Sequence, residues 1–260
     1  MKRWARFVSL FAGIGGLELG LERAFRRAGV FAWTGAQVEI DPFCRSVLER
    51  HWPHAERFDD VRTVRGLDLG TCDVLCGGFP CQDVSVAGKG GGLAGERSGL
   101  WREFARCIRE IRPAVVVVEN VTALRSRGLD DVLGDLASSG YYATWDCVPA
   151  RAIGAPHDRE RIFVVAWHVS DAHGEAVRIR AERDQRQGRG VRTPERWNPE
   201  PVERSASAWR GAVPELHRVA NGVSAGLDEA RIRALGNAVV PQVAERVGDL
   251  AVEVWRQLHP

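Results

Sequence analysis

The sequence predicts an α/β fold built on an open, largely parallel sheet. Strand-like and helix-like segments alternate through residues 6–167, which is the order expected of such a sheet. Residues 115–118 are four consecutive valines, typical of a strand that is buried on both faces. A glycine-rich turn follows the first strand-like segment. In folds of this kind ligands bind beyond the carboxyl ends of the strands, so we expect the functional side chains there.

The individual elements are predicted from hydrophobic patterns and end signals. Strands are expected at residues 6–10, 31–40, 73–76, 115–118, 142–148 and 161–167, and helices at residues 16–28, 42–51, 98–111 and 130–139. Asp41 and Pro42 are a favourable N-cap and first helical residue. Ser98 is expected to cap the helix that it begins. A last helix is predicted to open within residues 234–241.

Composition is that of an ordinary globular protein, with 45% hydrophobic and 27% charged residues in 260. The formal net charge of +2 does not by itself imply a polyanionic partner. No apolar run approaches the roughly 18 residues of a membrane span, and the first residues lead into a strand rather than a secretory leader. We therefore expect a cytoplasmic protein that does not bind membranes. The six cysteines lack paired Cys-x-x-Cys spacing, so no metal site is expected.

One cysteine stands in a distinctive setting, at the end of the predicted strand 73–76. The sequence there reads Gly77-Gly78-Phe79-Pro80-Cys81. Proline restricts the backbone before the cysteine, and a thiol presented in this way is suited to act as a nucleophile. The alternative is a small buried hydrophobic residue, as most free cysteines are.

Other residues with chemical potential also fall at predicted strand ends. The turn at residues 11–16 lets the backbone approach a ligand, and Glu39 lies where a ribose could be bound, although a simple packing turn explains the glycines equally well. Glu119 ends the valine strand, where burial would raise its pKa toward that of a useful proton donor. Arg159 and Arg161 are two residues apart, so both side chains would face the same side of an extended chain.

Taken in order, these segments resemble the DNA (cytosine-5)-methyltransferases of prokaryotic or phage type. The matching stretches are residues 11–16, Glu39, Asp60, residues 78–82, 95–100 and 119–121, Arg159 with Arg161, and residues 236–239. They lie within residues 7–167 and 234–257, which is most of the chain. The resemblance implies a Rossmann-like, S-adenosylmethionine-dependent methyltransferase sheet with a small, mostly irregular target-recognition region.

The resemblance also implies catalytic roles. The Cys81 thiolate would attack C6 of a cytosine flipped out of duplex DNA, and C5 would then take the methyl group of S-adenosylmethionine. Glu119 would donate a proton to N3, and Arg161 would hold the O2 carbonyl. Arg159 would assist at the site or the DNA backbone, and Asn120 would brace the loop that holds the cysteine. The base that removes the C5 proton is not identified by the sequence.

The expected binding residues follow from the same resemblance. For the cofactor they are Phe11, Gly13, Gly15, Gly16, Glu39, Asp60, Val61, Leu100, Asn237 and Val239. Glu39 would bind the ribose hydroxyls and Asp60 the adenine amine, with Asp59 as an adjacent alternative. For DNA they are Gln82, Ser85, Lys89 and Arg97.

Three parts of the chain are expected. Residues 1–167 would form the catalytic and cofactor-binding domain, residues 168–225 a small target-recognition region, and residues 226–260 a segment that returns to the catalytic domain. Residues 178–196 carry seven arginines against three acids, which suits phosphate contacts, with a solvated linker as the alternative. His157 stands where most members of the family have glutamine.

Other functions remain open at this stage. A methyltransferase of the same fold could act on tRNA. A catalytically silent DNA-binding relative and an NAD-dependent oxidoreductase are further alternatives, although the intact Cys81, Glu119 and Arg161 argue against the former and no hydride-transfer site supports the latter. We expect a monomer that acts on double-stranded DNA.

Overall fold

A single mixed sheet organises the protein. The computed structural model describes residues 4–80, 99–168 and 225–260. Within these residues the sheet has seven strands in the order β3-β2-β1-β4-β5-β7-β6. The strands are β1 Trp4–Leu10, β2 Phe31–Val38, β3 Glu56–Phe58, β4 Val74–Gly78, β5 Val115–Val121, β6 Tyr141–Pro149 and β7 Glu160–His168. The pairs from β3 to β5 are parallel, whereas β7 runs antiparallel to both β5 and β6. The predicted α/β sheet is confirmed, with a reversed strand near one edge.

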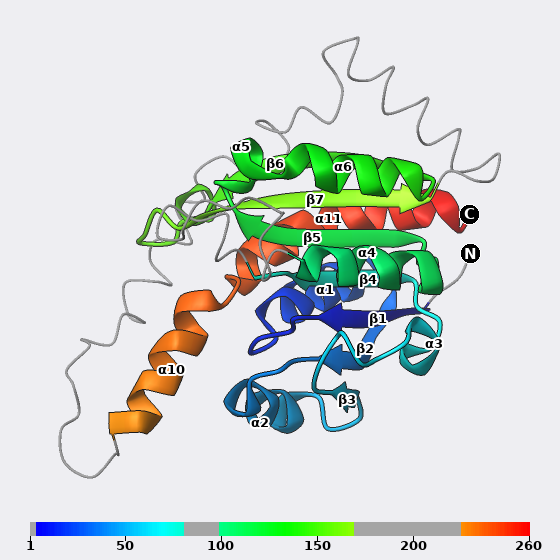
Figure 1. Cartoon of the computed structure of the whole chain (residues 1–260). Helices are drawn as coiled ribbons and strands as arrows, with labels where there is room; N and C mark the ends of the chain where they lie inside the picture. Colours follow the sequence, from blue (N-terminus) through cyan, green and yellow to red (C-terminus); the bar gives the residue numbers. More distant parts are fainter. Residues whose placement is uncertain (1–3, 81–98, 169–224) are drawn as a thin grey trace.

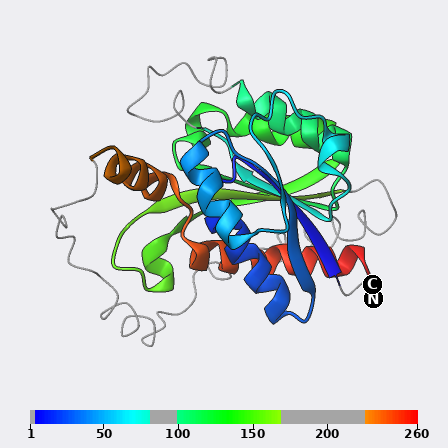
Figure 2. The ribbon, with the colours of Figure 1, turned by 90° about the horizontal axis from the view of Figure 1, so that it is seen from below.

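Helices cover both faces of this sheet (Figures 1 and 2). They are α1 Gly16–Arg27, α2 Pro42–His51, α3 Gly66–Leu69, α4 Leu100–Ile111, α5 Leu124–Arg127, α6 Leu129–Ser138, the 3₁₀ helix η2 Ala150–Ile153, α10 Ala225–Asn237 and α11 Pro241–Leu258. Helices α1 and α11 pack on one face, and α4 and α6 on the other. Helix α10 extends away from the body of the protein (Figure 1).

The four valines of β5 contribute to the hydrophobic cores on both faces of the sheet. Val115 and Val117 belong to the core beneath α1 and α11, whereas Val116 and Val118 belong to the core beneath α4 and α6. Successive side chains of a strand point to opposite faces, so a strand covered on both sides must be apolar at every position. By the same alternation, the side chain of Glu119 points to the face that α1 and α11 cover, near the carboxyl end of β5.

The C-terminal helix α11 is held closely against α1. A Cβ atom at Gly20 would lie 2.3 Å from the carbonyl oxygen of Pro241, and one at Gly248 would lie 2.6 Å from the Cβ of Ala24. Contacts this short leave room only for glycine. Arg27 on α1 also forms ion pairs with both Glu245 and Asp249 on α11.

Several element boundaries differ from the sequence prediction. Helix α2 begins and ends as predicted, with the Asp41 side chain accepting the amide hydrogens of Phe43 and Cys44. Helix α4 has Gly99, not a serine, at its N-cap, and Ser98 lies outside the described residues. The last helix, α11, begins at Pro241, within the predicted range 234–241, whereas helix α10, which ends at Asn237, was not predicted. The short elements β3, α3, α5 and η2 were not predicted, since three or four residues carry little periodic signal.

Candidate functional site

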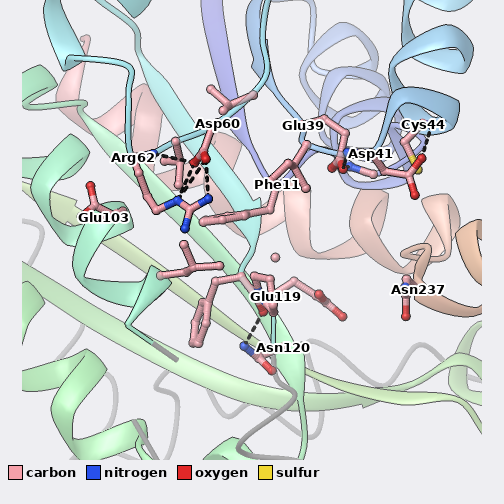
Figure 3. Close-up of a pocket in the computed structure, with 18 of the residues that line it drawn as sticks. Phe11, Glu39, Asp41, Cys44, Asp60, Arg62, Glu103, Glu119, Asn120 and Asn237 are labelled. Atoms are coloured by element: carbon pink, nitrogen blue, oxygen red, sulfur yellow. Dashed lines mark hydrogen bonds and ion pairs between the residues drawn. The ribbon is translucent and has the colours of Figure 1, made fainter. Parts of the chain in front are cut away.

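A pocket of about 900 Å³ opens at the carboxyl ends of the central parallel strands. Its lining comes from the turn after β1, the connection from β2 to α2, the residues that follow β3, the ends of β4 and β5, the start of α4, and α10 (Figure 3). The expected site residues that line it are Phe11, Gly13, Glu39, Asp60, Val61, Pro80, Leu100, Glu119, Asn120, Arg161 and Asn237. Distant parts of the sequence therefore meet where the fold class predicted a ligand site.

The glycine-rich turn adopts unusual backbone angles. Gly13 and Gly15 have φ values of +56° and +85°, which glycine adopts without strain. Phe11 also has a positive φ, of +55°, and such a conformation costs a larger residue about 1 kcal/mol or more. Strain of this kind concentrates at functional sites, and Phe11 lines the pocket.

Packing around this turn explains two of its glycines. A Cβ at Gly15 would lie 2.4 Å from the ring of Trp52, and one at Gly16 would lie 2.2 Å from the carbonyl oxygen of Val239. Gly15 is absent from the pocket lining, whereas Gly16 and Val239 line a smaller cavity next to it. The turn is thus a packing turn and a pocket wall at once.

Glu22 and Trp52, which the sequence analysis did not single out, hold the glycine-rich turn in place. The carboxylate of Glu22 accepts hydrogen bonds from the Trp52 indole, the Thr34 amide and the Thr34 hydroxyl at 3.1, 2.8 and 2.6 Å. Arg26 adds an ion pair at 2.7 Å. These bonds fix the Trp52 ring against Gly15. An acidic residue on the apolar face of α1 was the available signal.

Glu39 connects the turn to the next loop. Its carboxylate accepts the amide hydrogens of Gly13 and Asp41 at 2.7 and 2.8 Å. Because each carboxylate oxygen can accept more than one hydrogen bond, Glu39 retains acceptor capacity toward the pocket that it lines.

The side-chain partners of Asp59 and Asp60 bear on which of the two is better suited to bind the cofactor. Asp60 lines the pocket beside Arg62 (Figure 3), which donates to it from Nε and Nη2 at 2.5–3.0 Å. These hydrogen bonds lower the pKa of Asp60 below its usual range. The Asp59 side chain is 74% exposed and pairs with Arg45 at 3.4 Å. Asp60, 23% exposed, is the better fixed acceptor, and Arg62 is a pocket residue that the sequence analysis missed.

Glu119 is the most perturbed acid in the pocket. Only 7% of the residue is exposed, and burial raises its pKa from 4.5 to about 7, with Arg161 and Arg159 opposing the increase. The Arg161 Nε lies 3.1 Å from one carboxylate oxygen. The other oxygen lies over Gly78, where a Cβ atom would approach it to 2.6 Å. At neutral pH this carboxyl group is therefore partly protonated, as a proton donor requires.

Asn120 holds the chain just before the predicted nucleophile. Its Nδ2 donates to the carbonyl oxygen of Phe79 at 3.1 Å, and its Oδ1 accepts the Val121 amide hydrogen at 2.8 Å. Pro80 is the next residue and lines the pocket. The remaining predicted residues lie outside the described part of the chain: Cys81, Gln82, Ser85, Lys89 and Arg97.

The second predicted arginine lies beside the C-terminal segment. Arg159 does not line the large pocket, and its Nη1 donates to the carbonyl oxygen of Gly236 at 2.7 Å. It is still close enough to lower the pKa of Glu119. The adjacent Asn237 lines both cavities.

The described cysteines are poor nucleophiles. Burial raises the pKa of Cys76 well above its usual range, and burial together with Glu39 and Asp41 raises that of Cys44 to about 12. Across residues 4–80, 99–168 and 225–260 no group of histidine, cysteine and acidic side chains is arranged to hold a metal ion. Over the same residues no helix has the length and apolar character needed to cross a membrane.

Comparison with known proteins identifies the family. The family model for C-5 cytosine-specific DNA methylases matches residues 5–194. The chain belongs to the C-5 cytosine-specific DNA methylases. Among curated relatives, the chain is 34% identical over 169 residues to the Type II methyltransferase M2.BsuMI of Bacillus subtilis. The aligned region covers 62% of this chain and 41% of that relative. The chain is 31% identical over 170 residues to M.NgoBV of Neisseria gonorrhoeae, covering 61% and 40%. The match thus spans about two fifths of the length of these relatives.

Solved structures of methyltransferases share the fold of this chain. The Entamoeba histolytica methyltransferase EhMeth matches 63% of this chain and 53% of its own, with a TM-score of 0.54 and 18% identity. A Spodoptera frugiperda DNMT2 variant matches 64% and 51%, with a TM-score of 0.52 and 17% identity. The methyltransferase sheet predicted from the sequence is therefore confirmed.

Proposed function

We propose that the protein transfers a methyl group from S-adenosylmethionine to C5 of cytosine in duplex DNA, through a covalent adduct between Cys81 and a flipped base. Membership of the C-5 cytosine-specific DNA methylases supports the reaction type. The observation that carries the proposal is the buried carboxyl group of Glu119, which pairs with Arg161 and shares a pocket with Pro80, the residue before Cys81. Burial also raises its pKa to about 7, which suits a proton donor.

Each described side chain has a role that suits its surroundings. Attack of the Cys81 thiolate forms a bond to C6 and moves the electrons of the C5–C6 double bond toward C5, while N3 takes the proton of Glu119. Arg161, 3.1 Å from Glu119, would stabilise the carboxylate that results and would hold the O2 carbonyl. After methyl transfer to C5, a base removes the C5 proton and the bond between sulfur and C6 breaks.

The size, the apolar walls and the charge of the pocket support S-adenosylmethionine as the cofactor. About 900 Å³ lies within the range of ligand sites, and Phe11, Val61 and Leu100 give it apolar walls. Six acidic and four basic side chains line it, an excess that suits a positively charged sulfonium compound. When bound, S-adenosylmethionine supplies an electrophilic methyl group. Glu39 and Asp60 would hold its ribose and adenine, with Gly13, Gly16, Asn237 and Val239 around its methionine part.

The same proposal extends to partners and setting. The Type II relatives support a role in restriction and modification. We place the protein in the cytoplasm, acting as a monomer on double-stranded DNA. Residues 168–225 would supply the recognition of the target sequence, and Gln82, Ser85, Lys89 and Arg97 would contact DNA near the flipped base.

Methyl incorporation into different nucleic acids tests the proposal. The purified protein, supplied with labelled S-adenosylmethionine, is expected to label duplex DNA and not tRNA, and bisulfite sequencing of DNA from an expressing host should show 5-methylcytosine in one sequence context. Labelling of tRNA alone would reassign the substrate. Labelled adenine in the DNA would refute the chemistry.

A further inference from the structure

The segment that follows β3 carries two of the residues expected to hold the cofactor. Asp60 and Val61 both line the large pocket. The segment forms a turn, in which the Thr63 amide and hydroxyl both donate to the carbonyl oxygen of Asp60, at 3.1 and 3.0 Å. It lies between a three-residue strand and a four-residue helix, so regular structure on either side does little to hold it. The contacts that fix it come from another part of the fold.

Arg106 of α4 supplies these contacts. Its Nη2 donates to the carbonyl oxygens of Val61 and Val64 at 2.8 and 2.9 Å. Both valines are buried, and a buried carbonyl that loses its donor destabilises the conformation that buries it. Arg106 therefore fixes a stretch of backbone that starts one residue after Asp60.

Two carboxylates hold the guanidinium of Arg106 in place. Its Nε donates to Glu103 at 2.8 Å, and its Nη1 donates to both oxygens of Glu110 at 3.0 Å. Glu110 also accepts the Gly66 amide hydrogen at 2.5 Å, and a Cβ atom at Gly66 would lie 2.6 Å from that of Glu110. Helix α4 thus holds residues 61–66 at two points. All three guanidinium nitrogens are engaged, and only arginine offers donors in this forked arrangement.

Arg106 is set back from the pocket that these contacts shape. It does not line the pocket, whereas Arg102 and Glu103 of the same helix do. Any effect of Arg106 on cofactor binding therefore passes through the residues that it holds in place.

We propose that Arg106 is a positioning residue for the adenine part of S-adenosylmethionine, and that it acts by fixing Val61 and, through the turn, the carboxylate of Asp60. The inference rests on the proposed function. Adenine presents the hydrogens of its N6 amine, which a carboxylate accepts, whereas hypoxanthine presents an oxygen at that position, which a carboxylate repels. Asp60 already accepts hydrogen bonds from Arg62, and each of its oxygens can accept more than one. A carboxylate that is held in place selects adenine over hypoxanthine.

Calorimetric titration of Arg106→Met with two compounds tests the inference. They are S-adenosylhomocysteine and S-inosylhomocysteine, which carries hypoxanthine in place of adenine. The wild type should bind the adenine compound about tenfold or more tightly than the other. Methionine keeps the apolar stem of Arg106 but has no donors, so the variant should bind S-adenosylhomocysteine about tenfold more weakly and S-inosylhomocysteine within about twofold of the wild type. The rate of methyl transfer at saturating S-adenosylmethionine should stay within about threefold, because the change is in cofactor binding.

Arg109→Met is the matched control. Arg109 is an exposed arginine of the same helix, outside the contacts that hold residues 61–66. Both affinities of this variant should equal those of the wild type.

A double-mutant cycle separates positioning from a general loss of structure. In an Asp60→Ala background, Arg106→Met should leave the ratio of the two affinities unchanged, because both substitutions act on the same contact. Arg106→Lys keeps the charge without the fork, so it should also lose most of the selection, and it serves as the test if Arg106→Met does not fold.

Other outcomes would overturn the inference. An unchanged ratio of affinities in folded Arg106→Met would do so, as would an equal loss of affinity for both compounds, which would make Arg106 a purely structural residue. Full selection in Arg106→Lys would show that charge alone matters. Wild-type protein that binds neither compound would refute the proposed function together with the inference, whereas the variant results refute the inference alone.

Discussion

Replacing Glu119 with glutamine should abolish most activity and, at the same time, stabilise the fold at alkaline pH. Glutamine keeps the shape of the side chain and can still accept a hydrogen bond from Arg161, but it has no acidic proton for N3. Loss of a general acid typically lowers the rate by about 10²–10⁴. We expect a loss of that size in single-turnover methyl transfer at neutral pH, with the affinity for S-adenosylmethionine within about threefold of the wild type.

The gain in stability follows from the pKa of the buried acid. The pKa of Glu119 is about 7 in the folded protein and 4.5 without burial, so the folded state holds this proton more tightly than the unfolded state. The resulting stability is fully present below about pH 4, and it is lost as the pH rises through the folded value. Above about pH 8 the loss amounts to about 3 kcal/mol, because each pKa unit corresponds to about 1.4 kcal/mol.

Denaturant unfolding at several pH values provides the assay. Relative to the wild type, Glu119→Gln should gain about 3 kcal/mol between about pH 4 and about pH 8, and the difference should level off at both ends. For a chain of this size that gain corresponds to roughly 6–12 °C in melting temperature. Identical pH dependence in the two proteins would refute the raised pKa. Full activity in the variant would refute the role as proton donor.

Three other substitutions test separate parts of the site. Gly16→Ala adds a Cβ that would lie 2.2 Å from the Val239 carbonyl oxygen. It should lower the free energy of unfolding in denaturant by about 1–3 kcal/mol and weaken cofactor binding. Stability equal to that of the wild type would show that this contact is not tight. Glu39→Ala leaves the Gly13 and Asp41 amides without their shared acceptor, so the Kd for S-adenosylmethionine in calorimetry should rise by about tenfold or more, and an unchanged Kd would remove Glu39 from the cofactor site. Trp52→Phe removes the indole donor to Glu22 and should cost about 1–3 kcal/mol, whereas Trp33→Phe at a half-buried site serves as the control and should change little.

Local sequence signals predicted the parts of the site that a single segment determines. The glycine-rich turn, the N-cap at Asp41 and the position of Glu119 near the end of a buried strand each depend on a few adjacent residues. The structure shows all three, although the strand continues to Val121. The strand order and the reversal of β7 were not predicted. They depend on pairing between distant segments, such as Val121 with Arg161, which no local pattern specifies.

Supporting contacts were missed for the same reason. The bond between Trp52 and Glu22 joins residues 30 positions apart, and the contact of Gly16 with Val239 joins the two ends of the chain. Arg62 was not predicted to be a site residue, because Asp60 was considered only as an acceptor of hydrogen bonds from the cofactor. The pairing of these two side chains depends on the turn geometry after β3, which an aspartate repeated at positions 59 and 60 does not reveal.

Trapping of a covalent complex tests the central claim most directly. A duplex oligonucleotide with 5-fluorocytosine at the target position, incubated with the protein and S-adenosylmethionine, should yield a stable adduct, because the fluorine cannot leave C5 as the proton does. Mass spectrometry of the digested complex should place the nucleotide on Cys81, and Cys81→Ser should give no adduct. Absence of the adduct on DNA that the protein methylates at unmodified cytosine, or its attachment to another residue, would contradict the account.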